Sequence, residues 1–446
     1  MRTAIGKPIV KTLLLCAFGL AACGPRTEPF QTAALPDGDG YLTAVPAGDT
    51  RISNDSLADI FTKLTYFYED GSRRHGLYRF EEPITVNMIG DGVGQYQDFL
   101  SQVVSQIREE AGLDLQIAPE PTKVLIRFIP GEQFLPHTNN QCIIISGQPS
   151  WPEFARKPRD YVTPAKDAPL VMVREGVLIP DTIEPYKVRQ CILEELMQVL
   201  GTSNDLFGLG SSMFNDDQAH YWPTKLDYLM LQVLYDPQME TGLSIDEART
   251  RAREILRRLN PEGEEAPALL PVHLHAFKDW REQLQELSND DLSAEDALVI
   301  ARKLVAEASR RAPGSAHVCL GRATLAFLAQ AAEDPRTPDH FDAASELCTA
   351  IHGPDDIRIA NLRLGKAYDD YAKDRYHKAR DEASALIPVF KAHGQDDRLA
   401  AALILETTAA IFLEDPEWQD VLLPRTERWA AYAFGEDHEL TNDLRR

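Results

Sequence analysis

The stretch CILEELMQVLGTSND, residues 191–205, decides how the first half of the chain is interpreted. Successive residues of an α-helix are rotated by about 100° around its axis. On a helical wheel Glu195 therefore lies among apolar residues, with Val188, Ile192 and Val199 on the same side. Acidic residues are rarely buried without a partner. We expect Glu195 to be buried and to be balanced either by a metal ion or by hydrogen bonds.

The neighbouring polar residues repeat a known spacing. Glu194 and Gln198 are one helical turn apart on the adjoining face, and Gly201 and Asn204 follow at intervals of three. This EExxQxxGxxN pattern resembles the HExxHxxGxxH motif of metzincin zinc peptidases. The resemblance implies that Glu195 stands at the general-base position, and that Glu194, Gln198 and Asn204 stand at the three metal-ligand positions.

The ligand positions carry oxygen donors instead of histidines. Carboxylate and amide oxygens suit calcium, magnesium or manganese better than zinc. Glu194 is the one charged residue of the three, and a single negative charge is little for the capture of a divalent ion. Further carboxylates nearby in the sequence are Asp205, Asp216 and Asp217. We therefore do not expect zinc, and two alternatives stay open: a weakly bound divalent ion, or no metal at all.

A longer string extends the resemblance. Residues 211–217 read SSMFNDD and residues 223–239 read PTKLDYLMLQVLYDPQM. Together with residues 191–205 they resemble an uncharacterised bacterial domain family, many of whose members look like envelope lipoproteins. The resemblance covers about residues 60–245 and implies a zincin-like core without established chemistry. Within it, Met213 stands where a metzincin has its Met-turn.

The N-terminus resembles a bacterial lipoprotein signal. A basic start precedes an apolar run that ends at Ala22 and is too short to span a bilayer. Leu20-Ala-Ala-Cys23 resembles a lipobox, which implies removal of residues 1–22 and lipidation of Cys23, whereas a plain secretory signal needs no cysteine there. Residues 23–50 are rich in Pro, Gly, Asp and Thr and predict a flexible tether. Because Gly24 follows the cysteine instead of Asp, we expect anchoring in the outer membrane, facing the periplasm.

The charge limits the partners. The formal net charge of −23 argues against nucleic acid and against direct docking on anionic lipid. We therefore expect contact with the membrane through the lipid on Cys23 alone, and a protein or peptide as the other partner.

The cysteine count predicts two disulfides. Of the six cysteines, Cys16 is removed with the signal and Cys23 takes the lipid, which leaves four. An even remainder in an oxidising compartment favours disulfides over buried thiols. The pairing that we favour joins Cys142 to Cys191 and Cys319 to Cys348; four reduced cysteines are the alternative.

Patterning divides the body into two parts. Residues 51–243 mix helical periods with strands expected at 84–89, 115–118, 124–129, 142–145 and 170–173. After residue 243 the strand signals stop. A loose period of about 40 residues, with Leu-Gly at 320–321 and 364–365, is similar to tetratricopeptide-type helix hairpins. We expect an α+β zincin-like domain over 51–243 and an all-α, helical-hairpin region over 244–446, for which a plain helical bundle is the alternative.

Two functions follow from these patterns. The first is a cell-envelope lipoprotein with a degenerate metallopeptidase-like domain that binds protein and does not catalyse. The alternative is a metal-dependent, peptidase-like hydrolase of the envelope that uses Glu195 as its general base.

Overall fold

The computed structural model describes residues 34–38, 45, 52–68, 71–134, 142–158, 161, 172–215, 219–269, 278–287, 292–416 and 418–436. The expected signal segment 1–22 and the lipidation site Cys23 lie outside these residues. Within the described ranges, no helix combines the length and the apolar character that crossing a membrane requires.

The first part of the chain is built on a mixed β-sheet. Its strands, in the order β2-β1-β3-β5-β4, are β2 (Leu115–Ile117), β1 (Ile84–Ile89), β3 (Val124–Ile129), β5 (Glu175–Pro180) and β4 (Ile143–Ser146). The pairs β1–β2, β1–β3 and β3–β5 are parallel, and β4 is an antiparallel edge strand. Four of the five expected strands are confirmed. The domain is α/β and not the expected α+β, because three of its four strand pairs are parallel.

The fifth expected strand is misplaced. The apolar run at 170–173 predicts a strand, but β5 begins at Glu175. Residues 172 and 173 lie outside any strand, Val173 is 58% exposed, and residues 170 and 171 lie outside the described part of the chain. Every residue of β5 is buried, because this strand pairs with β3 on one side and β4 on the other. The position of β5 is therefore set by its pairing with the neighbouring strands, and the local pattern of apolar residues does not indicate that pairing.

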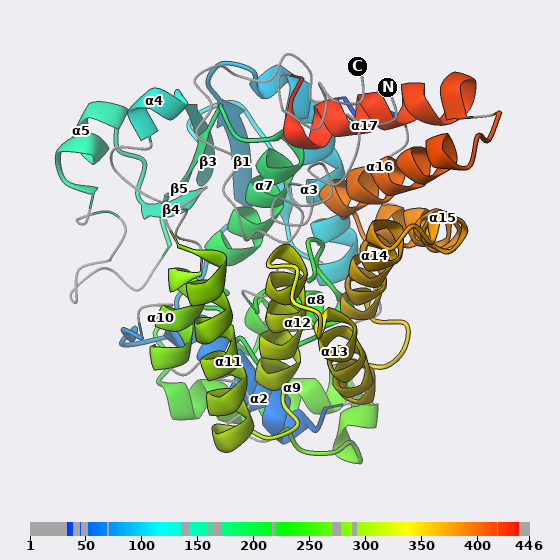
Figure 1. Cartoon of the computed structure of the whole chain (residues 1–446). Coiled ribbons are helices and arrows are strands. Elements are labelled where there is room, and N and C mark those ends of the chain that lie inside the picture. Colours follow the sequence, from blue (N-terminus) through cyan, green and yellow to red (C-terminus); the bar gives the residue numbers. More distant parts are fainter. Residues whose placement is uncertain are drawn as a thin grey trace.

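Helices cover the sheet on both faces. The larger core combines the strands with α2 (Asn54–Tyr66), α3 (Gln97–Ala111), α7 (Pro185–Val199), α8 (Lys225–Leu234) and α9 (Ile245–Leu259). A smaller apolar cluster on the opposite face packs α4 (Gly131–Phe134) and α5 (Trp151–Arg156) against β3, β4 and β5. Helix α7 follows β5 directly, so the sheet positions the helix that carries the motif (Figure 1).

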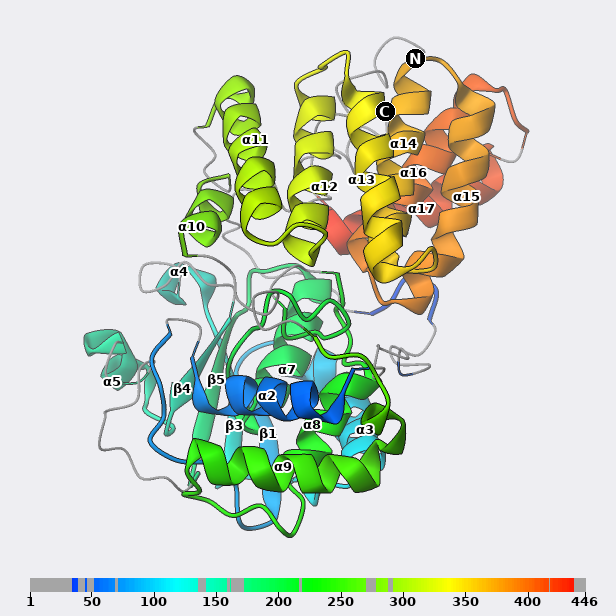
Figure 2. The ribbon, with the colours of Figure 1, turned by 90° about the horizontal axis from the view of Figure 1, so that it is seen from below.

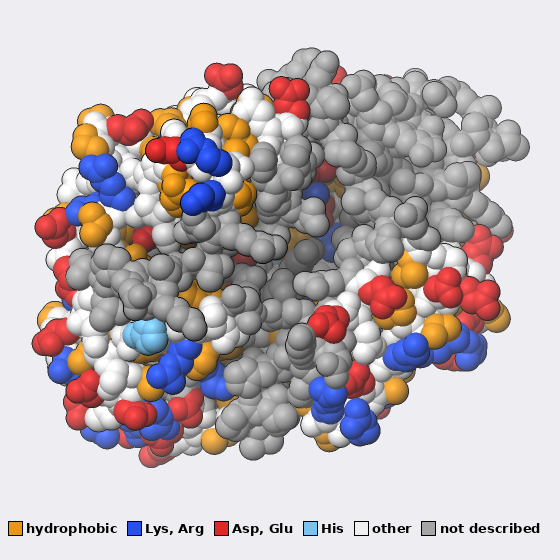
Figure 3. Space-filling view, turned by 90° about the vertical axis from the view of Figure 1, so that its left-hand side faces the viewer, with side chains coloured by type: hydrophobic (Ala, Val, Ile, Leu, Met, Phe, Trp, Pro, Cys, Tyr) orange, Lys and Arg blue, Asp and Glu red, His pale blue; other side chains and the backbone are white. Residues whose placement is uncertain are grey.

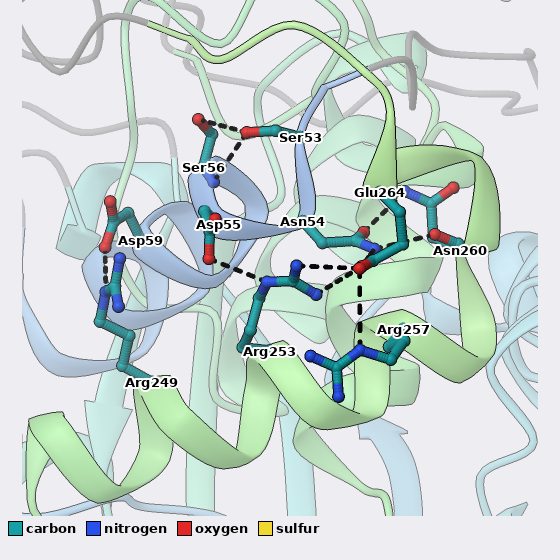
Figure 4. A network of polar contacts seen from close by, with 10 residues as sticks. All are labelled: Ser53, Asn54, Asp55, Ser56, Asp59, Arg249, Arg253, Arg257, Asn260 and Glu264. Atoms are coloured by element: carbon teal, nitrogen blue, oxygen red, sulfur yellow. Dashed lines mark hydrogen bonds and ion pairs between the residues drawn. The ribbon is translucent and has the colours of Figure 1, made fainter.

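Helix α9 lies beside α2, although it follows the boundary that we expect at residue 243 (Figure 2). Figure 4 shows the polar contacts: Arg249 pairs with Asp59, and Arg253 donates to Asp55 at 2.8 Å. Beneath them, Ala248 belongs to the larger core. The boundary stays a prediction, but the packing groups α9 with the α/β part.

The second part is entirely helical where it is described. After the short 3₁₀ turn η2 (Pro261–Glu264), its helices are α10 (Lys278–Glu286), α11 (Ala294–Arg311), α12 (Ala316–Ala331), α13 (Thr337–His352), α14 (Ile357–Ala372), α15 (Tyr376–Ala392), α16 (Asp396–Phe412) and α17 (Leu423–Phe434), with a π-helical turn over Trp418–Leu422. Consecutive helices pack as hairpins, and α14 also contacts both α12 and α16. At Gly365 an added Cβ would lie 2.5 Å from a ring carbon of Phe327, so this small residue permits the close packing of α14.

Both expected disulfides are confirmed. Cys142, immediately before β4, is joined to Cys191 in α7, and Cys319 in α12 is joined to Cys348 in α13. The first therefore ties the edge strand to the motif helix, and the second closes one helix hairpin.

One piece of the expected tether is packed in place. Residues 34–38 form a turn in which the Gly38 N–H donates to the Leu35 carbonyl at 3.1 Å. Leu35 packs against the core of the helical region. An apolar side chain therefore anchors these residues, and the flexible tether expected over 23–50 stays a prediction.

The two parts are stacked on one another. In Figure 2 the helices α11 to α15 stand on end over the α/β part. Acidic and basic side chains are interspersed over the described surface in Figure 3, so the net charge of −23 is not gathered into one field on that face.

Candidate functional site

Helix α7 places Glu195 in the interior. Pro185 occupies the first turn, where its missing N–H costs no intrahelical hydrogen bond. Glu195 is 8% exposed, between the fully buried Ile192 and Leu196, whereas Glu194 is half-buried. The expected burial of Glu195 is confirmed, and its role as general base stays a prediction.

Gly201 ends the helix and turns the chain. Its N–H donates to the Gln198 carbonyl at 2.9 Å, and its φ is +127°, a conformation that is essentially confined to glycine. An added Cβ would lie 2.7 Å from a methyl carbon of Leu234 and 3.1 Å from the carbonyl oxygen of Tyr78. Both the backbone conformation and the close approach therefore require the glycine that the motif predicts.

The polar residues of the motif bond to protein acceptors. The amide Nε2 of Gln198 donates to Oδ1 of Asp205 at 3.4 Å, and Nδ2 of Asn204 donates to the backbone oxygen of Lys63 in α2 at 3.0 Å. Ser203 adds a hydrogen bond from its hydroxyl to the Phe67 carbonyl at 3.3 Å. The turn after α7 is thereby joined to the C-terminal end of α2.

The two amide side chains at the expected metal-ligand positions form hydrogen bonds in different parts of the structure. Gln198 and Asn204 donate to different elements, one to the following loop and one to α2. Among the described residues, no three His, Cys, Asp or Glu side chains are grouped as a metal ion would need, and Asp216 and Asp217 lie outside those residues.

Met213 lies in a tight loop that is organised by Asp227. This carboxylate accepts hydrogen bonds from the Ser212 hydroxyl, from the Met213 N–H at 3.1 Å and from the Thr224 N–H at 2.7 Å. Burial raises the pKa of Asp227 to about 6, against the hydrogen bonds that lower it. Thr224 and Asp227 form a capping box at the start of α8, and the same carboxylate holds the Met213 loop, a second role that the sequence does not reveal.

The helical region packs against the loop that follows the motif and hydrogen-bonds to it. The ring of Phe207 lies 4.7 Å from that of Trp280 and 4.8 Å from that of His317, inside a cluster formed mainly by α10, α11 and α12. Three residues later, the Gly210 carbonyl accepts a hydrogen bond from Nη2 of Arg358 at 2.6 Å. Helices far along the chain therefore fix the position of this loop.

A buried charged cluster joins α7 to α16 and α17. Arg189 in α7 lies over the ring of Tyr432, 5.2 Å from its centroid, and the Tyr432 hydroxyl donates to Asp396 at 3.1 Å. Burial raises the pKa of Asp396 to about 7, while the positive charge of Arg189 opposes the shift and the nearby Asp397 adds to it.

The next residues of α16 extend the cluster to the loop after Met213. Asp397 pairs with Arg398 at 2.9 Å and accepts a hydrogen bond from the Tyr221 hydroxyl at 3.4 Å. Gln395 donates to the Ala219 carbonyl at 2.9 Å. The sequence analysis gives these residues no role. The one sequence feature that could have indicated a buried cluster is the run of charged residues at the start of the otherwise apolar helix α16.

The comparisons identify a domain and no activity. Residues 54–254 match a family model described as a protein of unknown function, DUF2927. No curated protein and no solved structure matches the chain significantly. The match begins at α2 and ends inside α9, so it spans the sheet, the motif helix and the helix pair of Figure 4. Residues 54–254, somewhat less than half of the chain, are therefore similar to a domain of unknown function, DUF2927.

Proposed function

We propose that this protein is a lipoprotein of the bacterial cell envelope, anchored through Cys23 in the outer membrane and facing the periplasm. Its α/β domain is a zincin-like fold that does not catalyse, and the protein acts by binding a protein or peptide partner. The helical region, with tetratricopeptide-like hairpins, supplies the surface for that partner.

The hydrogen bonding of the motif carries the non-catalytic part of the proposal. Gln198 and Asn204 occupy two of the three ligand positions, and each uses its amide nitrogen on an acceptor of the protein. Two such bonds brace the turn after α7 against its own loop and against α2. A polar network that is satisfied internally stabilises one arrangement of a turn, so these residues have a structural use that requires no metal.

The order of elements supports the zincin-like assignment. In the metzincin site that the motif resembles, a glycine turns the chain after the motif helix and a methionine turn comes downstream. Here α7 follows β5, Gly201 has φ +127°, and Met213 is buried in a turn held by Asp227.

The contacts of the helical region support binding over catalysis. Phe207 and Gly210, in the loop that in a metzincin leads away from the third ligand, are committed to Trp280, His317 and Arg358. The loop is thus a joint between the two parts of the chain.

Elemental analysis of the purified full-length protein tests the proposal. We expect no stoichiometric divalent metal in the wild type. We also expect Glu195→Gln to leave hydrolysis of casein and of peptidoglycan peptides at the level of a mock preparation, as in the wild type. Stoichiometric metal that is lost in Glu194→Ala, together with hydrolysis that is abolished in Glu195→Gln, would establish the hydrolase instead. Circular dichroism of both variants controls for folding.

The anchor is tested separately. Intact-mass analysis of the membrane fraction should show a lipid-modified N-terminus at Cys23, and Cys23→Ala should move the protein to the soluble fraction. A wild-type protein that is soluble and unmodified overturns the lipoprotein assignment.

A further inference from the structure

The turn Leu35–Gly38 is held on the helical region by contacts of two kinds. Pro36 and Gly38 suit the second and fourth positions of a β-turn, and Gly38 has φ +68°. Leu35 packs against the apolar core of the helical region. Oδ2 of Asp37 lies 3.2 Å from Nη2 of Arg425 in α17 and 3.8 Å from Nζ of Lys391 at the end of α15.

The charge arrangement makes this contact specific. The Asp37 side chain is 18% exposed and lies between two cations that come from different helices. Partial burial reduces the screening that weakens ion pairs on an open surface. A cation at position 37 would instead meet two like charges.

The contact shortens the reach of the N-terminus. Eleven Cα–Cα steps separate Cys23 from Ala34, so a fully extended chain spans at most about 40 Å. The next described contact of this segment is at Val45, against the α/β core, and from there the same limit would be about 80 Å.

We propose that the turn Leu35–Gly38 is a clasp, and that a lipid on Cys23 therefore holds the α15–α17 end of the helical region against the membrane. The α9 end of the molecule, which lies away from α17 in both ribbon views (Figures 1 and 2), then points into the aqueous space. This inference rests on the proposed lipid anchor, and the partner surface that it defines is a phospholipid bilayer.

Energy transfer to a labelled bilayer tests the placement. The lipidated full-length protein is reconstituted into liposomes of phosphatidylethanolamine and phosphatidylglycerol with a trace of rhodamine lipid. The donor dye is attached to Arg428→Cys in α17 or to Glu254→Cys in α9, both at exposed positions. We expect a higher transfer efficiency from position 428 than from position 254.

The clasp is tested by charge reversal. Asp37→Arg should reduce the difference between the two dye positions, and the double variant Asp37→Arg/Arg425→Asp should restore it. Equal transfer from both positions in the lipidated wild type, or no effect of Asp37→Arg, overturns the inference and leaves the lipoprotein assignment intact. A product without lipid overturns both, and the mass of the protein distinguishes the two failures.

Discussion

Gly201 is the residue at which the motif and the fold meet. Its φ of +127° and its approach to Tyr78 and Leu234 bring the turn after α7 close to neighbouring elements. The hydrogen bond from Asn204 to the backbone of Lys63 then follows within three residues. The glycine therefore serves the packing of the turn, whether or not its neighbours ever held a metal.

We expect Gly201→Ala to lower the free energy of unfolding by about 2–3 kcal/mol, since it adds a close contact to an unfavourable φ. The control is Gly112→Ala, at φ +70° with open space around the added Cβ, which should cost about 1 kcal/mol. Urea denaturation measures both. Equal losses would mean that the contacts with Tyr78 and Leu234 do not matter.

At the scale of elements, α7 is held from two directions. The Cys142–Cys191 disulfide ties it to the edge strand β4, one turn ahead of Glu195. The hydrogen bonds of the following turn tie its other end to α2. The helix is thus fixed at both ends of the segment that carries the motif.

Removal of the Cys142–Cys191 disulfide by a double serine substitution should lower the free energy of unfolding by about 3–4 kcal/mol in the chain-entropy model. Hydrogen–deuterium exchange should rise in β4 and α7 and stay unchanged in α12 and α13. Removal of the Cys319–Cys348 disulfide is the matched control and should give the opposite pattern. An increase spread evenly over both parts in both variants would show that neither disulfide acts locally.

The sequence predicts a helix or a strand when burial of the element leaves a recognisable pattern of apolar residues. The strand β1 was predictable because its residues alternate with the period of a half-buried strand. The strand β3 was predictable as a short apolar run that is buried almost throughout. The start of β5 was not, since its burial depends on both neighbouring strands. At the candidate site, the burial of Glu195 and the bend at Gly201 were predictable from spacing.

At the scale of the whole molecule, the interface between the two parts contains charges that no local pattern reveals. Arg189 and Asp396 lie about two hundred residues apart in sequence and meet only because α17, which packs beside α16, also packs against α7. Asp397 and Arg398 are buried beside them. The way in which the second part closes on the first could therefore not be derived from periodicity.

Asp396 should make stability depend on pH. Its pKa is raised from 3.8 to about 7 by burial, so the folded state favours the protonated carboxyl. The stabilising contribution is complete below about pH 4 and is lost as the pH rises through 7. Relative to Asp396→Asn, which cannot ionise, the wild type should lose roughly 2–4 kcal/mol of unfolding free energy over this range.

Urea denaturation at pH 4, 5.5 and 7.5 measures this difference. Asp355→Asn, at an exposed position between α13 and α14, is the control and should run parallel to the wild type. Parallel curves for Asp396→Asn as well would show that Arg189 keeps the carboxylate ionised throughout.

The contacts of the Phe207 ring with Trp280 and His317 have a practical consequence for recombinant expression. A fragment cut at residue 254, where the family match ends, would leave the rings of Phe207 and Tyr186 without the helices that cover them. Newly exposed aromatic surface promotes aggregation. Insolubility of such a fragment would therefore reflect the missing cover and would say nothing against the folding competence of the full-length chain.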